Sequence, residues 1–497
     1  MKKILLLCIA SLLFISMEGK AVKKEMVNVK DFGAIGDGLF LDTRYIQNAL
    51  DSGKIVYFPA GVYRTGTLFL KSGGGIHLSA NAVILGSRYP EDYNANDFDK
   101  RNTFSVKERS SGAHLIIARD CENITISGTG TINGNRNGIF NTDIIHTPNS
   151  KHPRYVLPRW RPGAMLYFVG CRNVKLNGIR LNDPTYWTAF FHDCEDVDID
   201  RVTIQTDRHT LNSDGFDIDC CRKVNISNCN IFSGDDSIAI RGNQGPLGKA
   251  AVCSDITVSD CILSSAACGV RVGVGSGTIR NCKLTNLKMV NTNIGICISP
   301  SYAIGKCTAI DNVLFENISI DADQSLLIAP NWGNDIDDPA IQKVSNITFR
   351  NIEAVSDKAN LIVWPFKKDM FENISIENST FSLRPGATSP AEKQRHWKHT
   401  DFGIINQLGG KEIPISNCKG FSEDGKTLLL KRDRSKLTNL SARLTFHGCR
   451  NDKWCCRNVP NVRQTSRGCH NDKLCPPGSW SVRQTFRGCR NGKWYPR

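Results

Sequence analysis

Two short acidic phrases hold the side chains best suited to chemistry. They read Asn212-Ser213-Asp214 and Gly234-Asp235-Asp236, and Asp214 and Asp235 are 21 residues apart. Carboxyl groups that share a small space repel one another, so the pKa of one rises and it can stay protonated. A protonated carboxyl group can act as general acid while an ionised one activates water, as in inverting glycosidases, where the groups are roughly 6.5–9.5 Å apart. The phrases therefore predict an acid–base site built from Asp214, Asp235 and Asp236.

This site needs Asp235 and Asp236 on one side of the chain. Neighbouring residues of a strand point to opposite faces, so the two can share a site only where a strand ends or bulges. Gly234, directly before them, would permit that. The alternative is that solvated acids line a turn or bind a cation, and the second acidic phrase 21 residues earlier favours catalysis.

Aromatic, amide and basic side chains near the acids are candidates for binding a substrate. Asn212 adjoins Asp214, and Trp187 and His192 precede Asp214 by 27 and 22 residues. The stretch from residue 141 to 162 could form a subsite wall, with His146, His152, Tyr155, Trp160 and Arg161 as its candidates. Each of these side chains, taken singly, is more often structural than ligand-binding.

A repeated phrase predicts the framework that positions these residues. A turn-forming residue followed by an alternating apolar, polar, apolar triplet occurs at Asn123, Asn173, Asp196, Lys223, Asp255, Asn312, Asn346 and Asn373. From Val174, the first apolar residue recurs at 197, 224, 256, 279, 313, 347 and 374, in steps of 23, 27, 32, 23, 34, 34 and 27. Alternation with period two indicates strands, and repetition at this period indicates a solenoid. We expect parallel strands stacked coil on coil, with loops of variable length between them.

Many of these phrases also match the acceptor pattern for N-glycosylation. We favour a structural role for their asparagines, because Asn tolerates the left-handed backbone that a coil turn needs.

The cysteines fit the same stacking. Cys229, Cys261 and Cys282 each lie three residues after an apolar strand residue. Equivalent positions on successive coils are roughly 4.8 Å apart, so we expect an inward column of thiols, with a disulfide as the alternative. Thirteen cysteines lie between Cys8 and the six of the C-terminal tail, an odd number. Complete pairing of these thirteen would therefore need an outside partner.

The ends of a solenoid need covers, because open strand edges invite aggregation. Residues 42–51 have the pattern of a short amphipathic helix, with Asp42 or Thr43 as its cap. Ile46, Ala49 and Leu50 would face inward. We expect this helix to close the N-terminal end.

The two ends of the chain differ from its body. Residues 1–20 combine a basic start, a short apolar run and small residues, which is typical of a secretory signal; an uncleaved anchor is the alternative. Residues 436–497 form a basic tail in which a Gly-Cys phrase recurs every 20 residues. The tail could be a disulfide module that binds an acidic glycan, but we favour a disordered or out-of-frame extension. Residues 21–435 would be the catalytic domain.

Charge excludes one class of function. The net charge is +15, of which residues 441–497 carry +10 and the signal +2. The body is therefore close to neutral and gives no sign of nucleic-acid binding.

Between about Val27 and Leu383 the chain resembles glycoside hydrolase family 28, the polygalacturonases and their relatives. Residues 29–38, 56–61 and 65–71 are typical of the N-terminal part of that family, although other β-helix enzymes share them. The family's Asn-Thr-Asp stands here as Asn-Ser-Asp at 212–214, and its Gly-Asp-Asp is intact at 234–236. The resemblance implies an all-β fold, a single-stranded right-handed parallel β-helix with a short N-terminal capping helix.

The resemblance also implies roles for the three acids. Asp235 would be the general acid, and Asp214 and Asp236 would position and deprotonate the attacking water. Hydrolysis would invert the anomeric centre.

Two family motifs are missing. Cys268 stands where the resemblance expects a histidine, and Cys297 and Ser299 stand where it expects an arginine and a lysine that grip a substrate carboxylate. A guanidinium and an ammonium group suit galacturonate, so their loss puts that sugar in doubt. Arg271 could substitute from the neighbouring coil; a core or salt-bridged arginine is the alternative.

Together these observations predict a secreted or periplasmic monomer that hydrolyses a pectic polysaccharide or oligosaccharide. We expect no cofactor, no metal, no nucleic-acid partner and no membrane association after signal cleavage. One alternative is a β-helix polysaccharide lyase that uses calcium and a basic residue. The other is a non-catalytic solenoid that binds glycans.

Overall fold

The computed structural model describes residues 25–141, 143–145, 153–303, 306–328, 342–357, 361–363 and 370–384, and short strands beyond residue 400. The predicted signal segment, His146, His152 and almost all of the tail lie outside the described residues. The predicted domain boundaries stay a prediction.

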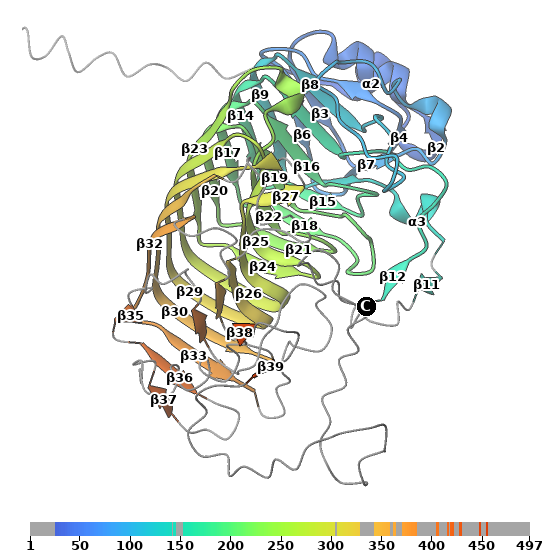
Figure 1. Cartoon of the computed structure of the whole chain (residues 1–497). Helices are drawn as coiled ribbons and strands as arrows, with labels where there is room; N and C mark the ends of the chain where they lie inside the picture. Colours follow the sequence, from blue (N-terminus) through green and yellow to red (C-terminus); the bar gives the residue numbers. More distant parts are fainter. Residues whose placement is uncertain are drawn as a thin grey trace, which may run out of the picture. The chain divides into compact units, whose positions relative to one another are not determined.

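The chain winds into a right-handed parallel β-helix whose coils each contribute strands to three parallel ladders (Figure 1). The first ladder contains β1 (Met26–Asn28), β3 (Ile55–Phe58), β6 (Gly75–Leu78), β9 (Glu122–Gly128), β14 (Arg172–Asn177), β17 (Glu195–Asp200), β20 (Arg222–Ser227), β23 (Val252–Ser259), β32 (Phe371–Glu377) and β35 (Ile415–Ser416). The second contains β2 (Asp37–Leu41), β4 (Gly61–Thr65), β7 (Ala82–Gly86), β10 (Thr131–Asn133), β15 (Arg180–Asn182), β18 (Thr203–Gln205), β21 (Asn230–Ser233), β24 (Ile262–Ser265), β33 (Thr380–Leu383) and β36 (Lys419–Phe421).

The third ladder carries the site. It contains β5 (Leu68–Phe69), β8 (Ile116–Arg119), β13 (Leu166–Val169), β16 (Ala189–His192), β19 (Phe216–Asp219), β22 (Ile238–Gly242), β25 (Cys268–Gly275), β31 (Leu361–Val363) and β34 (Ile404–Asn406). Longer strands turn the corners and join more than one ladder: β26 (Thr278–Ser299), β29 (Ala309–Ile328) and β30 (Val344–Ser356).

Smaller elements complete the described structure. Short antiparallel pairs join β11 (Ile144–Ile145) to β12 (Arg154–Tyr155), β27 (Ser301–Ala303) to β28 (Lys306–Cys307), β36 to β37 (Thr427–Leu429), and β38 (His447–Gly448) to β39 (Trp454–Cys455). The helices are η1 (Val29–Phe32), α2 (Thr43–Leu50), η2 (Pro90–Asp92), α3 (Arg136–Ile139) and η3 (Gly245–Leu247). None of the helices in the described part is long and apolar enough to span a membrane.

Alternation along each strand separates the core from the outer face. In β19, Phe216 and Ile218 belong to the core, so the residues between and after them, Asp217 and Asp219, project from the other face. The core continues from coil to coil, because parallel register puts like side chains on top of one another. Phe168 and Phe191, for example, stack with their ring centroids 4.8 Å apart.

The predicted coil turns are confirmed. Every residue that opens the repeated phrase, from Asn123 to Asn373, has a positive φ between 50° and 62°. The asparagine side chains also bond from coil to coil: the Asn173 amide donates to Asn123 at 2.6 Å, and the Asn373 amide donates to Asn346 at 3.0 Å. Their recurrence therefore has a structural cause.

The predicted register is wrong at one coil. Ile256 pairs with Cys282, not with Ile279, and Cys282 pairs with Val313. The sequence pattern missed this because a cysteine takes the place of the aliphatic residue. Asn281, with its φ of 55°, is the turn residue that marks the true position.

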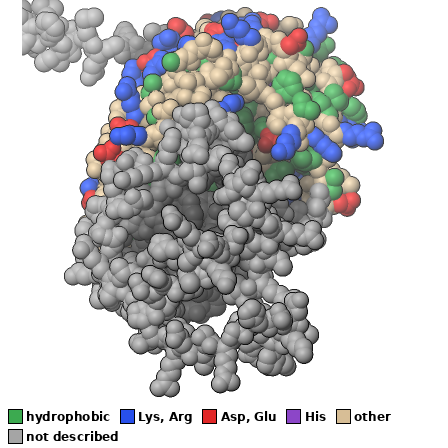
Figure 2. All heavy atoms as spheres, viewed as in Figure 1, with side chains coloured by type: hydrophobic (Ala, Val, Ile, Leu, Met, Phe, Trp, Pro, Cys, Tyr) green, Lys and Arg blue, Asp and Glu red, His purple; other side chains and the backbone are tan. Residues whose placement is uncertain are grey.

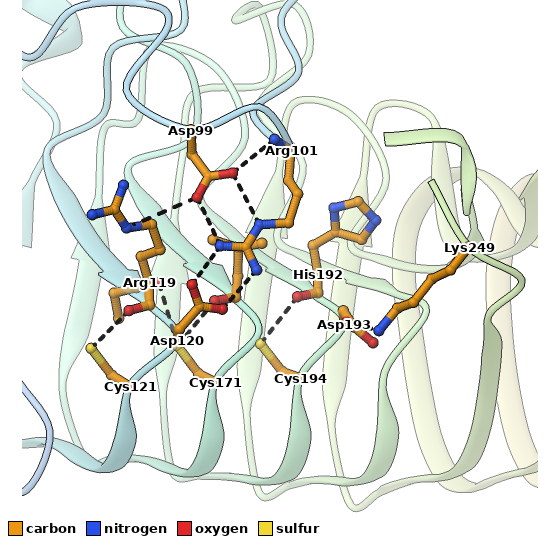
Figure 3. Close-up of polar contacts among 12 residues, drawn as sticks. Asp99, Arg101, Arg119, Asp120, Cys121, Cys171, His192, Asp193, Cys194 and Lys249 are labelled. Carbon is orange, nitrogen blue, oxygen red and sulfur yellow. Dashed lines mark hydrogen bonds and ion pairs between the residues drawn. The ribbon is translucent and has the colours of Figure 1, made fainter. Parts of the chain in front are cut away.

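The shift also changes the predicted thiol column. The backbone N–H of Cys229 contacts Cys261 Sγ at 3.4 Å, so these two stack, whereas Cys282 belongs to another column. A longer ladder that the sequence analysis missed comprises Cys121, Cys171, Cys194, Cys221 and Cys253, each one residue before a paired strand position. Figure 3 shows the first three in a row on successive coils. All thirteen body cysteines are thiols, and twelve are buried.

The predicted N-terminal helix is present as α2, with Ile46, Ala49 and Leu50 buried. Asp42 is its N-cap residue, but the Asp42 side chain does not cap the helix. Its carboxylate instead accepts hydrogen bonds from the backbone N–H groups of Ile35 (2.7 Å) and Gly36 (2.9 Å). That α2 closes the end of the β-helix stays a prediction.

The surface of the described part fits the near-neutral charge of the body. On the face shown in Figure 2, basic and acidic side chains are interspersed over the coloured region. Exposed ion pairs connect neighbouring coils; Glu195, for example, bonds to Arg222 and Lys223, each at 3.0 Å.

Candidate active site

A pocket of roughly 290 Å³ lies against the outer face of the third ladder. Strand residues, the connections that precede the strands and a loop around residue 105 line it. The lining residues are Thr103, Phe104, Ser105, Glu108, Tyr186, Trp187, Asn212, Asp214, Asp235, Asp236, Arg241, Asn243, Arg271 and Val274. Four of these fourteen are acids and two are arginines, so the pocket is strongly polar.

The three predicted acids meet in this pocket. Asp214 precedes β19, and Asp235 and Asp236 lie in the connection between β21 and β22, where the strand has ended as expected. One carboxylate oxygen of each residue lies within 4.8 Å of the other two. Asp214 and Asp236 are each 5% exposed, whereas Asp235 is more open to the pocket.

Close backbone packing holds the two acidic phrases together. The Gly234 N–H donates to Ser213 Oγ at 3.1 Å, and this hydroxyl donates to Thr210 O at 2.8 Å. A Cβ on Gly234 would lie 2.4 Å from Ser213 Oγ and from Thr210 O, so only glycine fits. The Asn212 N–H then reaches Asp235 Oδ2 at 3.1 Å. These contacts tie the general-acid candidate on one coil to the coil before it.

Arg271 forms an ion pair with Asp236. Its Nε donates to Asp236 Oδ2, and its Nη2 donates to Oδ1 at 3.2 Å. The Cys268 N–H adds a bond to Oδ1 at 3.0 Å. Asp236 thus accepts three N–H groups, two of them from the Arg271 guanidinium.

Burial and mutual repulsion act on the other acids. Burial, and then the charge of Asp236, raise the pKa of Asp235 to about 6. Burial raises the pKa of Asp214 well above its usual range, and the charges of Asp217, Asp235 and Asp236 add to this effect. Two carboxyl groups of the site thus hold a proton more tightly than usual, which suits a general acid.

The predicted binding residues fall into two groups. Asn212, Trp187 and Arg271 line the pocket. Arg161 and His192 do not line it, and both are fully buried.

Arg161 lies behind the pocket wall and holds it in place. It donates to Asn212 Oδ1 at 2.9 Å and to the backbone oxygen of Glu108 at 2.8 Å. Two further bonds reach the backbone oxygens of Thr185 (2.8 Å) and Leu211 (2.7 Å).

His192 contacts Asn243 O through Nε2 at 3.2 Å.

The structure adds site residues that sequence reasoning missed. Arg241 lies over the Trp187 ring at 4.6 Å and pairs with Asp217 and Asp219. The alternation of apolar and acidic residues in β19 could have predicted the position of Asp217 and Asp219, because it places both on the outer face of the strand, where the pocket lies. The position of Arg241 beside these acids follows from the strand register, because Arg241 on β22 pairs with Asp219 on β19.

Glu108 is another missed residue. It accepts the Tyr186 hydroxyl at 2.5 Å. No local pattern connects Glu108 with residues a hundred positions later, so only the folded loop reveals it.

The positions of the missing family motifs are buried. Cys297 and Ser299 are each 2% exposed and do not line the pocket. Cys297 pairs in register with Arg271, and Cys268 Sγ accepts from Arg271 Nη2 at 3.4 Å.

Two groups of described side chains carry donor atoms suited to a metal ion. One is Asp214, Asp235 and Asp236, and the other is His192, Asp219 and Cys220. In each group an arginine already supplies positive charge, because Arg271 pairs with Asp236 and Arg241 pairs with Asp219.

Clustered carboxyl groups in a pocket of this kind are able to carry out acid–base cleavage of a glycosidic bond. Residues 92–393 match the family described as Glycosyl hydrolases family 28, and the chain belongs to that family. Residues 26–155 also match a family described as rhamnogalacturonase A/epimerase, pectate lyase-like. The chain is therefore a glycoside hydrolase of the polygalacturonase-like type.

Relatives and solved structures agree with this placement. A probable polygalacturonase of Vitis vinifera is 25% identical over 403 residues, which cover 76% of this chain and 77% of the relative. Polygalacturonase-2 of Solanum lycopersicum is 26% identical over 332 residues, or 59% and 68% of the two chains. An exopolygalacturonase from Thermotoga maritima shares the fold, with a TM-score of 0.59 at 19% identity over 81% of this chain and 93% of that one. A polygalacturonase from Erwinia carotovora does so with a TM-score of 0.55 at 16% identity, over 77% and 95%.

Proposed function

We propose that this glycoside hydrolase is secreted and cleaves a pectic polysaccharide or oligosaccharide by single displacement. Asp235 acts as general acid, and Asp236 and Asp214 activate and orient water. The observation that carries the proposal is the convergence of three carboxylates, with one oxygen of each within 4.8 Å, in a pocket on the outer face of the β-helix.

Each acid has its own step in the proposed reaction. Asp235, the most open of the three, gives its proton to the glycosidic oxygen as the bond to the anomeric carbon breaks. A water molecule attacks that carbon and loses its proton to Asp236, which Arg271 holds in place through an ion pair. Asp214, protonated through burial, donates a hydrogen bond that orients this water. The surrounding carboxylates favour the positive charge that develops on the sugar.

The anomeric form of the product tests the proposal. One oxygen of each carboxylate lies within 4.8 Å of the others, whereas the carboxyl groups of typical inverting enzymes are roughly 6.5–9.5 Å apart. The stereochemistry therefore needs a direct measurement. Proton NMR of the first products from pectic polymers would show inversion if the single-displacement mechanism holds. Retention would contradict it, and a new ultraviolet absorbance from a conjugated double bond would indicate a lyase instead.

The pH dependence of activity provides a second test. Asp235 must be protonated to act, and its pKa is raised to about 6, so kcat/KM should fall as pH rises through that value. The expected profile has an alkaline limb with an apparent pKa near 6, measured from reducing ends released at low substrate concentration. A rate that stays level to about pH 8 would contradict Asp235 as the acid.

The N-terminal sequence supports secretion, since residues 1–20 have the order of a signal peptide. We propose that the enzyme acts outside the cytoplasm as a monomer. Mass measurement of the exported protein would show whether cleavage occurs near residue 20.

A further inference from the structure

The charges on the pocket wall bear on which sugar the enzyme accepts. Among the described residues that line the pocket, the cations are Arg241 and Arg271. A sugar carboxylate is usually held by a guanidinium or ammonium group that can turn toward it. The question is whether either arginine is available for this purpose.

The Arg271 side chain is occupied by its ion pair with Asp236. Two of its nitrogens contact the two oxygens of that carboxylate, and its side chain is only 12% exposed. To bind a uronate it would have to leave Asp236, which would remove the positive partner of a nearly buried acid.

The Arg241 side chain is likewise occupied by ion pairs, with Asp217 and Asp219. Its Nη1 lies 3.0 Å from Asp217 and its Nε lies 3.4 Å from Asp219, and both acids are fully buried. The guanidinium also lies against Trp187 and is 13% exposed. Two carboxylates thus surround one cation.

Two more arginines lie behind the pocket, but they point to backbone. Arg154 donates to Arg208 O at 2.5 Å and to Gly234 O at 2.6 Å. Arg161 is fully buried among backbone oxygens and Asn212. Neither side chain is among the residues that line the pocket.

Each arginine on the pocket wall therefore already has an acidic partner. Asp236 balances Arg271, Asp217 and Asp219 balance Arg241, and Glu108 remains on the wall. Ionisation of Asp214 or Asp235 would add more negative charge. A carboxylate placed here would meet repulsion, because like charges brought together out of water are strongly unfavourable.

The rest of the wall suits an uncharged sugar. Phe104, Tyr186, Trp187 and Val274 offer apolar surface, and Thr103, Ser105, Asn212 and Asn243 offer hydrogen-bonding groups. These uncharged residues suit the ring face and the hydroxyl groups of a sugar that carries no carboxylate.

We infer that the sugar bound at Asp214, Asp235 and Asp236 is neutral, so that the enzyme cleaves pectic glycans at an uncharged residue instead of at galacturonate. This inference rests on the proposed hydrolysis at these three acids. Uronate residues can still occupy neighbouring positions of the same glycan, outside the pocket.

A matched pair of polymers tests the inference directly. Polygalacturonate and its carboxyl-reduced counterpart have the same linkage and differ in charge. Both, together with rhamnogalacturonan, are digested in oxygen-18-labelled water, and mass spectrometry identifies the sugar that forms the new reducing end. We expect a neutral sugar there, and a kcat/KM at least about ten-fold higher for the reduced polymer than for the acid.

The outcomes separate the two proposals. Galacturonate at the new reducing end, with a preference for the acid polymer, would overturn the neutral-sugar inference and leave the hydrolase proposal intact. No cleavage of any of the three polymers would overturn both.

A charge introduced into the pocket offers an independent check. Thr103 lines the pocket and is partly exposed. Thr103→Lys should raise the ratio of acid-polymer to reduced-polymer rates by about ten-fold, whereas the uncharged Thr103→Gln should leave the ratio unchanged. An equal ratio in both variants would count against charge as the basis of selection.

Discussion

Replacing Asp235 with asparagine should lower kcat by roughly 10²–10⁴-fold, the usual contribution of a general acid. Asparagine keeps the shape of the side chain but cannot donate a proton to the glycosidic oxygen. Reducing-end release by the purified variant on a cleavable pectic glycan measures the loss. Asp196→Asn is a matched control, because Asp196 is an acid on the first ladder with a side chain that is 56% exposed. If Asp235→Asn retained full activity, the proposed role would be wrong.

The same variant should keep its fold. The pKa of Asp235 is raised to about 6 in the folded protein, above that of the unfolded chain, so the folded state binds the proton more tightly. The contribution of this group to stability is therefore complete at low pH and is lost as pH rises through about 6. Asparagine cannot ionise, so the variant does not lose stability in this way as pH rises. Urea unfolding at pH 8 should therefore give the variant a free energy of unfolding equal to or greater than that of the native enzyme. A large loss of stability would instead indicate that the inactivity comes from misfolding.

Replacing Arg241 with methionine should lower the free energy of unfolding by about 3–5 kcal/mol. Asp217 and Asp219 are fully buried, and Arg241 is the cation that pairs with both. Without Arg241 these two carboxylates lose the cation that pairs with both of them. Urea denaturation followed by circular dichroism measures the change. The exposed pair of Arg201 and Asp200 provides the control: Arg201, with a side chain 63% exposed, should tolerate methionine with a loss of no more than about 1 kcal/mol.

Two further measurements show whether charge is the cause. Adding Asp217→Asn and Asp219→Asn to the Arg241→Met variant should restore most of the lost stability, because no buried carboxylate then lacks a partner. Burial raises the pKa of Asp217 to about 7, so the acid is mostly protonated at pH 5 and the cost of losing Arg241 should be smaller there than at pH 8. A loss that is the same at both pH values, and that the triple variant does not repair, would point to packing instead.

Arg241 links this stability to the site. Its guanidinium lies against Trp187, which lines the pocket, and its partner acids project from β19, three and five residues after Asp214. The buried pair and the proposed catalytic acids therefore share one face of the third ladder. A variant of Arg241 should affect substrate binding as well as stability.

Different residues of the pocket bear on the reaction and on the choice of sugar. The proposed catalytic acids lie in the pocket, and each arginine on the pocket wall pairs with an acid. If the neutral-sugar inference holds, relatives named as polygalacturonases indicate the reaction of this chain but not its sugar.

The sequence by itself determined the local rules of this fold. The alternating phrases predicted parallel strands, and the residues that open them predicted the left-handed turns, because both depend on a few neighbouring residues. The position of Asp235 and Asp236 after a strand end also followed from Gly234 and from alternation. The one register error came where Cys282 replaced an aliphatic residue, since the pattern recognises a type of side chain and not its depth in the core.

Tertiary structure decided everything that depends on which coils and loops touch. The ladder of five thiols, the pairing of Arg241 with Asp217 and Asp219, and the arrival of Glu108 at the pocket join residues from different coils. Arg161 and Arg271 show the limit most clearly, because both read as substrate-binding cations in the sequence. The fold buries the first behind the wall and pairs the second with Asp236. Residue type gives a charge, but only packing shows whether that charge is already neutralised by a neighbour.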